Sequence, residues 1–371
     1  MRTLKGSSLL IERGGDLELK KVSLSTFSYL PNLTLVDQLR SLITSLFSAG
    51  EQGAFYIPRP IVNGTQSLFQ DAAGTVPVTA DGDPVGSMAD QSPNEHTAVQ
   101  STSAARPTYN ASPDRLSLDK VDDALIITVP TGGWNGTMVL ATDEGTVSYG
   151  VDIPAGDYNL GGEYFPGNAI VGVVFRDGAL SAEEKANVEA YFVGNGATAS
   201  YGAVSNFGYF WRGRSEITEF PLIDTSGGTS FDLAWYQCSS LTSFPLVDTS
   251  SVTIFYGAWQ RCSSLTSFPL IDTSSGTIFK ETWRYCSSLT SFPANAFDNI
   301  KGGNFTVAFI DTALDQTSID GILVSLVASG IAAGTRIFDQ SGGSAPSVAT
   351  GQPAIDTLRS RGWTVTVQGG Y

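Results

Sequence analysis

Few residues in this sequence have the types and spacing that carry enzyme chemistry. The single histidine, His96, lies in a polar loop, and no Gly-x-Ser-x-Gly turn supplies the nucleophile of a Ser–His–Asp hydrolase. Glycoside hydrolysis requires two positioned carboxylates, whereas Asp122 with Asp123, and Glu183 with Glu184, are sequence neighbours that point apart. The sequence therefore favours a protein that is not an enzyme, with polysaccharide cleavage as the alternative.

Calcium is the one ion for which the sequence offers a set of ligands. Asp81 and Asp83 flank a glycine and could bind Ca²⁺ together with Asp90, although such turns are common without an ion. The three cysteines stand 24 residues apart, without a Cys-x-x-Cys pair, which is unlike a zinc site or a disulfide framework. We expect no cofactor, with Ca²⁺ as the alternative.

The cysteines belong to a 24-residue repeat. The repeat is marked by a tryptophan column and a Phe-Pro column: Trp211, Trp235, Trp259, Trp283; Phe220, Phe244, Phe268, Phe292. The last three copies read WxxCSSLTSFP, whereas the first has Arg214 in the cysteine position, as expected of a cap. One unit is too short to bury its own apolar side chains. We therefore predict a stacked solenoid with Trp, Leu and Phe columns inside and Cys238, Cys262 and Cys286 as a buried ladder.

Three aspartates, Asp224, Asp248 and Asp272, occupy the same place in a DTS motif of successive repeats. Like charges in a column repel one another unless each carboxylate accepts hydrogen bonds from its own turn. An Asx-type turn in each coil is the favoured interpretation. A cation bound between neighbouring aspartates and a carboxylate surface that recognises a ligand are the alternatives.

Aromatic residues at the coil edges could stack on sugars. The candidates are Tyr236, Tyr256 and Tyr285, together with Phe255. Packing in the solenoid core is the favoured interpretation of these rings. The three tyrosines and the three aspartates together form the candidate ligand- or host-binding face. The threonines of the DTS motifs suggest an ice-binding face as a further alternative, but the threonine rows match that pattern only in part.

A leucine pattern precedes the β-rich part of the chain. Leu35, Leu39, Leu42 and Leu46 are spaced as the a and d positions of a short coiled coil or of an amphipathic helix. Packing of this helix on its own domain is the favoured interpretation, because two heptads are a weak oligomer signal. Self-association through these leucines, as a trimer, is the alternative.

The remaining segments predict a mainly β protein in four parts. We expect an N-terminal attachment arm with a helix, an antiparallel β-sandwich-like domain, the 24-residue-repeat leucine-rich solenoid, and a C-terminal α/β cap, at 1–52, 53–200, 201–306 and 307–371. Strands are predicted at 124–130, 137–142, 146–154 and 169–175. Ser181 and Glu184 form a capping box for a covering helix, and the cap contains a helix ending at Gly330 and a final strand.

The charge balance and the hydropathy exclude several classes of function. The formal net charge is −15, which repels nucleic acid and anionic membrane surfaces. We find no signal peptide in the first residues and no stretch of about 18 apolar residues that would insert into a membrane.

Two segments resemble known families. Residues 211–306 resemble the leucine-rich repeats of BspA-type bacterial surface proteins, in which a CSSLTSL-like strand precedes a DTSxVT turn. Residues 54–109 resemble a module of tailed-bacteriophage virion proteins, whose DxSGNGNHAxQ core and ARP motif lead into a concanavalin-like or LamG-like sandwich. Here the segment from Asp90 to His96 departs from that core, so the family's calcium or glycan site is not carried over.

The resemblance implies a non-enzymatic virion protein, assembled in the host cytoplasm. In the leading interpretation it is a tail fibre or receptor-binding protein, attached by its N-terminus, that presents the repeats to the host surface. A capsid decoration protein or head fibre is the alternative. The implied partners are other virion proteins, a host cell-surface glycan or protein, and two further copies of the chain in a homotrimer.

Overall fold

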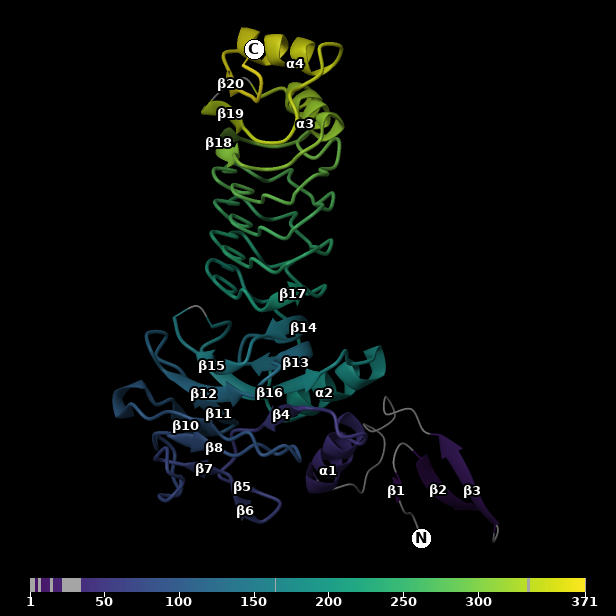
Figure 1. Cartoon of the computed structure of the whole chain (residues 1–371), viewed down its shortest axis with the longest axis vertical. Coiled ribbons are helices and arrows are strands. Elements are labelled where there is room, and N and C mark those ends of the chain that lie inside the picture. Colours follow the sequence, from purple (N-terminus) through teal and green to yellow (C-terminus); the bar gives the residue numbers. More distant parts are fainter. Residues whose placement is uncertain are drawn as a thin grey trace. The chain divides into compact units, whose positions relative to one another are not determined.

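The computed structural model describes residues 4–5, 8–13, 16–21, 35–163, 165–331 and 334–370. Over these ranges the protein is mainly β, with antiparallel sheets and the four helices α1 to α4 (Figure 1). The chain divides into two compact units. The first contains residues 1–163 and 167–199, and the second contains residues 164–166 and 200–371. None of the helices in the described ranges is long and apolar enough to cross a membrane.

The expected N-terminal arm lies within the first unit. It contains three short antiparallel strands that the sequence did not predict: β1 (Leu4–Lys5), β2 (Ser8–Arg13) and β3 (Asp16–Lys21). Residues 22–34 of the arm lie outside the described residues. The helix predicted from the leucine pattern is present as α1 (Leu35–Leu46).

Two antiparallel sheets form the body of the first unit. One has the order β10-β11-β16-β13-β14, and β4 also pairs with β16. Its strands are β4 (Gly53–Tyr56), β10 (Thr108–Ala111), β11 (Asp114–Ser117), β13 (Trp134–Thr142), β14 (Thr146–Ile153) and β16 (Ala169–Asp177). The four strands predicted between residues 124 and 175 are all confirmed, as β12 (Ala124–Val129), β13, β14 and β16.

The second sheet has the order β15-β12-β9-β8-β7. Its strands are β7 (Leu68–Phe69), β8 (Ser87–Met88), β9 (Ala98–Val99), β12 (Ala124–Val129) and β15 (Gly156–Gly161). Before β7 in the sequence, β5 (Ile61–Val62) and β6 (Thr65–Gln66) form a separate antiparallel hairpin. The Tyr158 ring on β15 meets the Phe175 ring on β16 edge to face, with their centroids 5.5 Å apart. The two sheets therefore contact each other through aromatic side chains.

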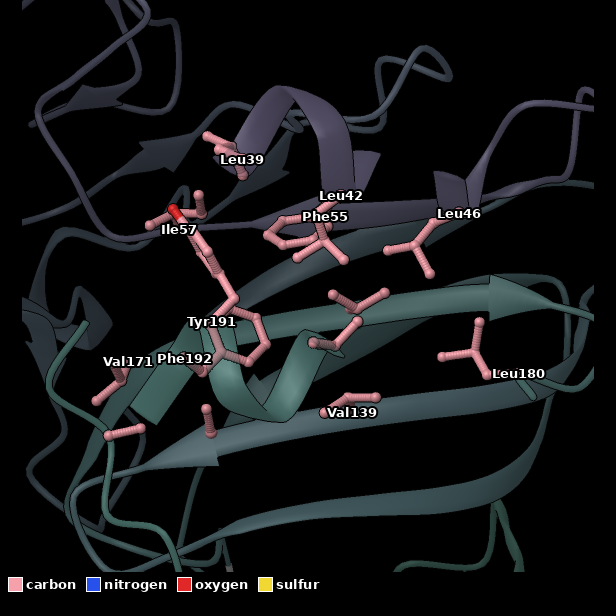
Figure 2. Packing of buried hydrophobic residues seen from close by; sticks show 14 of the residues in the cluster. Leu39, Leu42, Leu46, Phe55, Ile57, Val139, Val171, Leu180, Tyr191 and Phe192 are labelled. Atoms are coloured by element: carbon pink, nitrogen blue, oxygen red, sulfur yellow. The ribbon is translucent and has the colours of Figure 1, made fainter. Parts of the chain in front are cut away.

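Helix α1 packs its leucine face against its own unit. Leu39, Leu42 and Leu46 are at most 5% exposed and belong to one buried cluster with residues of β4, β13, β16 and helix α2 (Ala182–Gly194) (Figure 2). The cluster includes Phe55, Val139, Val171, Tyr191 and Phe192. The alternative of self-association is therefore wrong for Leu39, Leu42 and Leu46, because the first unit already covers these three side chains. The side chain of Leu35 lies outside the described residues.

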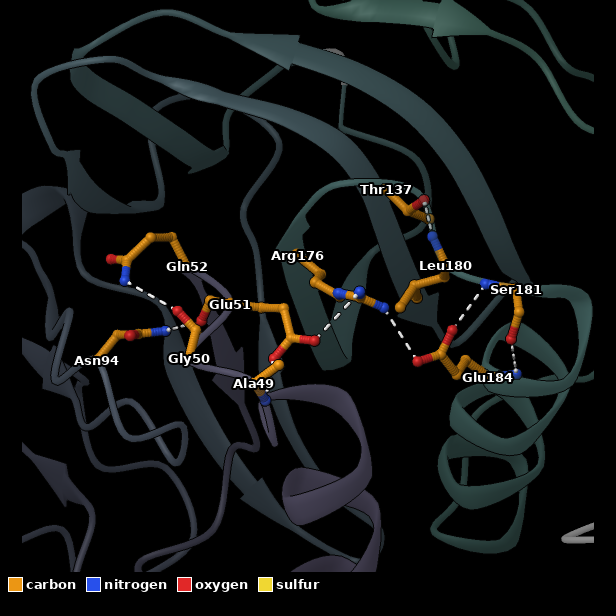
Figure 3. A network of polar contacts seen from close by, with 10 residues as sticks. All are labelled: Ala49, Gly50, Glu51, Gln52, Asn94, Thr137, Arg176, Leu180, Ser181 and Glu184. Atoms are coloured by element: carbon orange, nitrogen blue, oxygen red, sulfur yellow. Dashed lines mark hydrogen bonds and ion pairs between the residues drawn. The ribbon is translucent and has the colours of Figure 1, made fainter. Parts of the chain in front are cut away.

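A polar network holds the ends of both helices against the sheet (Figure 3). Arg176 on β16 forms ion pairs with Glu184 (3.0 Å) and with Glu51 (3.5 Å), which follows α1. Glu184 also completes the predicted capping box, since Ser181 Oγ accepts a hydrogen bond from the Glu184 N–H and the Ser181 N–H donates to the Glu184 carboxylate. One guanidinium thus connects both helices.

In the second unit, equivalent residues of successive repeats lie above one another. The coils between β17 (Ile217–Glu219) and β18 (Gly303–Phe309) are joined by backbone hydrogen bonds, such as Trp235 N–H to Ala258 O (2.8 Å). The indole rings of Trp235 and Trp259 stack with centroids 5.3 Å apart and planes within 4°. The predicted Trp, Cys, Leu and Phe columns are buried: Trp211, Trp235, Trp259, Trp283; Cys238, Cys262, Cys286; Leu241, Leu265, Leu289; Phe220, Phe244, Phe268, Phe292.

The C-terminal part contains a parallel three-stranded sheet and two helices. Its strands are β18, β19 (Arg336–Gln340) and β20 (Thr364–Thr366), and its helices are α3 (Gln316–Ala328) and α4 (Gly351–Ser360). The predicted helix is α3, whose apolar face at Ile319, Ile322, Leu323 and Leu326 is buried. The sequence did not predict α4. Strand β18 extends the stack beyond the fourth repeat, because the Phe309 ring stacks on Trp283.

Candidate functional site

A groove runs along one edge of the stacked coils and is lined by two columns of residues. Its volume is about 520 Å³, within the range of about 300–1,000 Å³ that is common for ligand sites. One column stands two residues after each tryptophan and contains Gly213, Gln237, Arg261 and Tyr285; Asp311, two residues after Phe309, continues it. The other column, four residues after each tryptophan, consists of serines: Ser215, Ser239, Ser263, Ser287.

The backbone of the first column is fixed by the stack. Gln237, Arg261, Tyr285 and Asp311 all have φ between 56° and 64°, the left-handed region that costs a non-glycine residue about 1–2 kcal/mol. Each repeat nevertheless adopts this geometry, because the N–H at this position donates to a carbonyl of the next coil, as from Arg261 to Arg284 O (2.8 Å). At Asp311 the N–H donates instead to the Ser341 hydroxyl. The ladder sets the backbone, and the side chain is left to differ from coil to coil.

Arg261 is the one cation among the residues that line the groove. Its guanidinium lies 4.7 Å from the centroid of the Tyr285 ring, one coil further along. Arg284 also lies over this ring, at 4.6 Å, but it is held in an ion pair with Glu281 at 3.1 Å. Within the described residues no carboxylate pairs with Arg261. Its positive charge is therefore free to meet a ligand.

The groove also presents hydrogen-bonding groups of both kinds. Ser263 Oγ donates to the Ser239 carbonyl at 3.3 Å, while the structure describes no hydrogen-bond partner for the hydroxyls of Ser239 and Ser287 or for the Gln237 amide. Asp311 is exposed and adds a carboxylate at the end of the groove. Donors, acceptors and one aromatic ring lie together here, and this set fits a polyhydroxylated ligand.

The three aspartates of the candidate face form turns, as the favoured interpretation predicts. Asp224 and Asp248 accept hydrogen bonds from the N–H of the residue two further on, at 3.0 Å in both cases, and Asp272 does the same at 2.8 Å. The hydroxyl of Ser226 lowers the pKa of Asp224, and the N–H of Ser250 lowers the pKa of Asp248. All three carboxylates are exposed, and none of them lines the groove.

The three tyrosines of the candidate face are half-buried, so the favoured core placement was wrong for them. Each ring lies beside a cation: Tyr236 beside Arg212 (5.0 Å), Tyr256 beside Lys280 (5.4 Å), and Tyr285 beside Arg261. Of the three, only Tyr285 lines the groove. Phe255, in contrast, is fully buried.

The threonines of the DTS motifs do not form an ice-binding face. Thr225, Thr249 and Thr273 are at most 5% exposed. Their hydroxyls donate to carbonyls of the next coil, as from Thr249 to Asp272 O at 2.5 Å. They stabilise the stack, and they are not available to order water.

The cysteines are structural, as predicted. All three are free and fully buried, and each thiol donates to the carbonyl of the tryptophan in the preceding coil, at 3.1 Å for Cys238, 3.2 Å for Cys262 and 3.0 Å for Cys286. Burial raises the pKa of Cys286 to about 12 and that of Cys262 well above its usual value. Neutral, enclosed thiols of this kind are poor nucleophiles.

The predicted calcium ligands are not brought together. Asp90 is half-buried, and its carboxylate accepts hydrogen bonds from the backbone N–H groups of Phe55, Ser92 and His96, while desolvation raises its pKa. The carboxylate cluster in the described ranges is a different one, Asp119, Asp122 and Asp123, whose oxygens lie within 4.8 Å of one another. Asp119 accepts three backbone hydrogen bonds from residues 121–123, which accounts for the cluster as a turn.

The single histidine has no catalytic surroundings. The ring of His96 packs edge to face on Trp134, with centroids 5.3 Å apart. Asp90 contacts its backbone N–H at 3.0 Å, so this carboxylate does not orient the imidazole. A Ser–His–Asp arrangement is not formed at this position.

Sequence reasoning missed most of the groove: Gln237, Arg261, Asp311 and the serine column. A signal was present, because the position two residues after each tryptophan reads Gly, Gln, Arg and Tyr, whereas the tryptophan itself and the serine four residues after it are the same in all four copies. A comparison of the chain with protein-family models, curated proteins and solved structures found no significant match.

Proposed function

We propose that this chain is a non-enzymatic structural protein of a bacteriophage virion, of the tail-fibre or receptor-binding type. The second unit, as a leucine-rich-type solenoid, presents its coil edge to the host cell surface, and its ligand there is a glycan. The proposal combines the sequence resemblance with the groove along the repeats. Assembly takes place in the host cytoplasm.

The groove is the observation that carries the binding role. The side chains of the Trp, Leu and Phe columns are buried in the core of the stack. In contrast, the same left-handed backbone conformation carries four different side chains, at Gln237, Arg261, Tyr285 and Asp311. A position that is structurally constant and chemically variable is suited to recognition, and left-handed backbone at non-glycine residues concentrates at functional sites.

Attachment to the particle is assigned to the residues before Leu35. Leu39, Leu42 and Leu46 of α1 are buried in the first unit, so these three leucines offer no free surface to another protein. A homotrimer remains part of the proposal, with its contacts on a surface other than α1. Mass measurement of the purified chain in solution tests this point.

Competition with adsorption tests the receptor-binding role. Purified full-length chain is added to host cells before particles that contain it, and we expect a dose-dependent fall in adsorption. Separation of dissociated particles into heads and tails then locates the protein with a specific antibody. Recovery with tail-less heads, without inhibition of adsorption, would overturn the proposal in favour of a capsid decoration protein or head fibre.

A further inference from the structure

We infer that the groove that runs from Gly213 to Asp311 binds an oligosaccharide that carries a carboxylate, and that Arg261 pairs with this carboxylate. This inference rests on the proposed function and names its ligand class. The observations that carry it are the geometry of Arg261 in the groove, the free hydrogen-bonding groups beside it, and the backbone ladder beneath it.

The backbone ladder excludes a peptide that adds as a strand. Such a peptide needs unpaired N–H and C=O groups at an exposed edge. Along the groove the N–H groups of Gly213, Gln237 and Tyr285 already donate to the following coil, at 2.7, 2.9 and 2.8 Å. These N–H groups are therefore not available to pair with a peptide strand.

The charges of the groove exclude a nucleic acid. A phosphate backbone is held by several cations in succession. Here the lining has the single cation Arg261 and the carboxylate of Asp311, in a chain with a formal net charge of −15. One isolated negative group among neutral hydroxyls fits this distribution better.

The neutral groups of the groove match the hydroxyls of a sugar chain. Ser239 and Ser287 offer hydroxyls that both donate and accept, and the Gln237 amide adds a donor and an acceptor. The serine column repeats once per coil, so hydroxyl groups recur along the groove, as sugar units recur along a glycan.

Arg261 supplies the selectivity for an acid. A guanidinium binds a carboxylate through two parallel hydrogen bonds, and this geometry is specific to arginine. The Tyr285 ring at 4.7 Å steadies the guanidinium from one side, while no carboxylate of the described chain neutralises it. A ligand carboxylate would complete the pairing that the protein itself does not provide.

The test is binding of the full-length chain to an array of bacterial surface oligosaccharides. Members that carry uronic or sialic acid are placed beside their carboxyl-reduced counterparts, and affinities are then measured by calorimetry. We expect the acidic forms to bind more tightly. Arg261→Gln should weaken binding of the acidic forms by about 10- to 100-fold and leave the reduced forms unchanged.

Two further variants control for charge and geometry. Lys301→Gln removes the same charge at an exposed position outside the groove lining, and its affinity for the acidic forms should equal that of the unaltered chain. Arg261→Lys keeps the charge without the planar fork, and its affinity should fall between those of the unaltered chain and Arg261→Gln.

Failures of the inference and of the proposed function are distinguishable. Equal binding of acidic and reduced forms, or an equal loss in Lys301→Gln, overturns the role of Arg261 while a glycan-binding role stands. Competition with adsorption but no binding to any acidic oligosaccharide overturns the ligand class alone. If the chain binds neither cells nor sugars, both proposals are wrong.

Discussion

The two units of this protein build their hydrophobic cores in different ways. In the first unit, one cluster takes different residues from each of five elements, α1, β4, β13, β16 and α2. The side chains of this cluster do not recur in a repeated position of the chain. In the second unit, the same side chains recur at each level, and each ring stacks mainly on its neighbours above and below. Departures from a constant pattern are visible only in the second unit, and one of the two columns that line the groove consists of such departures.

The largest effect is expected from the centre of the stack. Trp259→Ala removes a fully buried ring between Trp235 and Trp283, and we expect it to lower the free energy of unfolding by about 3–5 kcal/mol. Denaturant unfolding followed by circular dichroism measures this change. Trp259→Phe should lose less, because it keeps a stacked ring and the indole N–H has no hydrogen-bond partner among the described residues. A loss below about 1 kcal/mol in Trp259→Ala would contradict a core made of columns.

A comparable loss is expected in the first unit. Leu42→Ala leaves a cavity in the cluster under α1, and the free energy of unfolding should fall by about 2–5 kcal/mol. Arg40→Ala, an exposed position on the same helix, should change it by about 0.5 kcal/mol or less. The mass of the chain in solution should stay the same in both variants. A change of mass in Leu42→Ala alone would restore this face as a contact between copies.

Alkaline pH should destabilise the second unit through its thiols. The folded pKa of Cys286 is raised to about 12, whereas an unfolded thiol ionises near about 8.5. Because the folded pKa is the higher one, stability is complete below about pH 8.5 and falls as the pH rises towards 12. At pH 10 this thiol should account for a loss of about 2 kcal/mol.

Cys286→Ala isolates this contribution. Unfolding of the unaltered chain and the variant is measured from pH 7 to 10, and the other groups that titrate in this range are common to both. The variant should lose less stability over the range. Parallel pH profiles would show that the Cys286 thiol ionises equally in the folded and unfolded states.

A smaller effect is expected from the hydroxyls between coils. Thr249→Val removes a buried donor and leaves the Asp272 carbonyl without it, so we expect a loss of about 1 kcal/mol. Thr253→Val removes an exposed hydroxyl that donates to Thr229 O at 3.2 Å, and water can replace that donor. The difference between the two variants in the free energy of unfolding, measured with denaturant, shows how much more a buried hydroxyl contributes to stability than an exposed one. Equal losses would contradict it.

The sequence predicted the parts of the fold that depend on periodic patterns. The columns of the second unit, the capping box of α2 and the apolar face of α3 were correct in their residues, because spacing alone determines which side chains share a face. Strands of two residues, such as β8 and β9, were not predicted, because so short a segment has no measurable period and is fixed by its partners.

The candidate site was predicted only at Tyr285. The repeat register identified which positions pack, but Arg261 and Asp311 lie in the groove with a left-handed backbone, which hydrogen bonds to Arg284 O and to the Ser341 hydroxyl accompany. That conformation is unusual for arginine and tyrosine, so the backbone preferences of these residue types did not predict it. For α1, in contrast, the spacing of the leucines predicted the helix itself. It did not determine whether the leucine face packs on its own domain or on another copy of the chain.

The near-identical coils also affect how such a chain can change over generations. Recombination between two WxxCSSLTSFP segments would add or remove a whole 24-residue coil while the stacked columns stay in register. Such an event changes the length of the groove and the order of its variable side chains without a new core. A lineage could therefore alter what this edge recognises by exchanging modules.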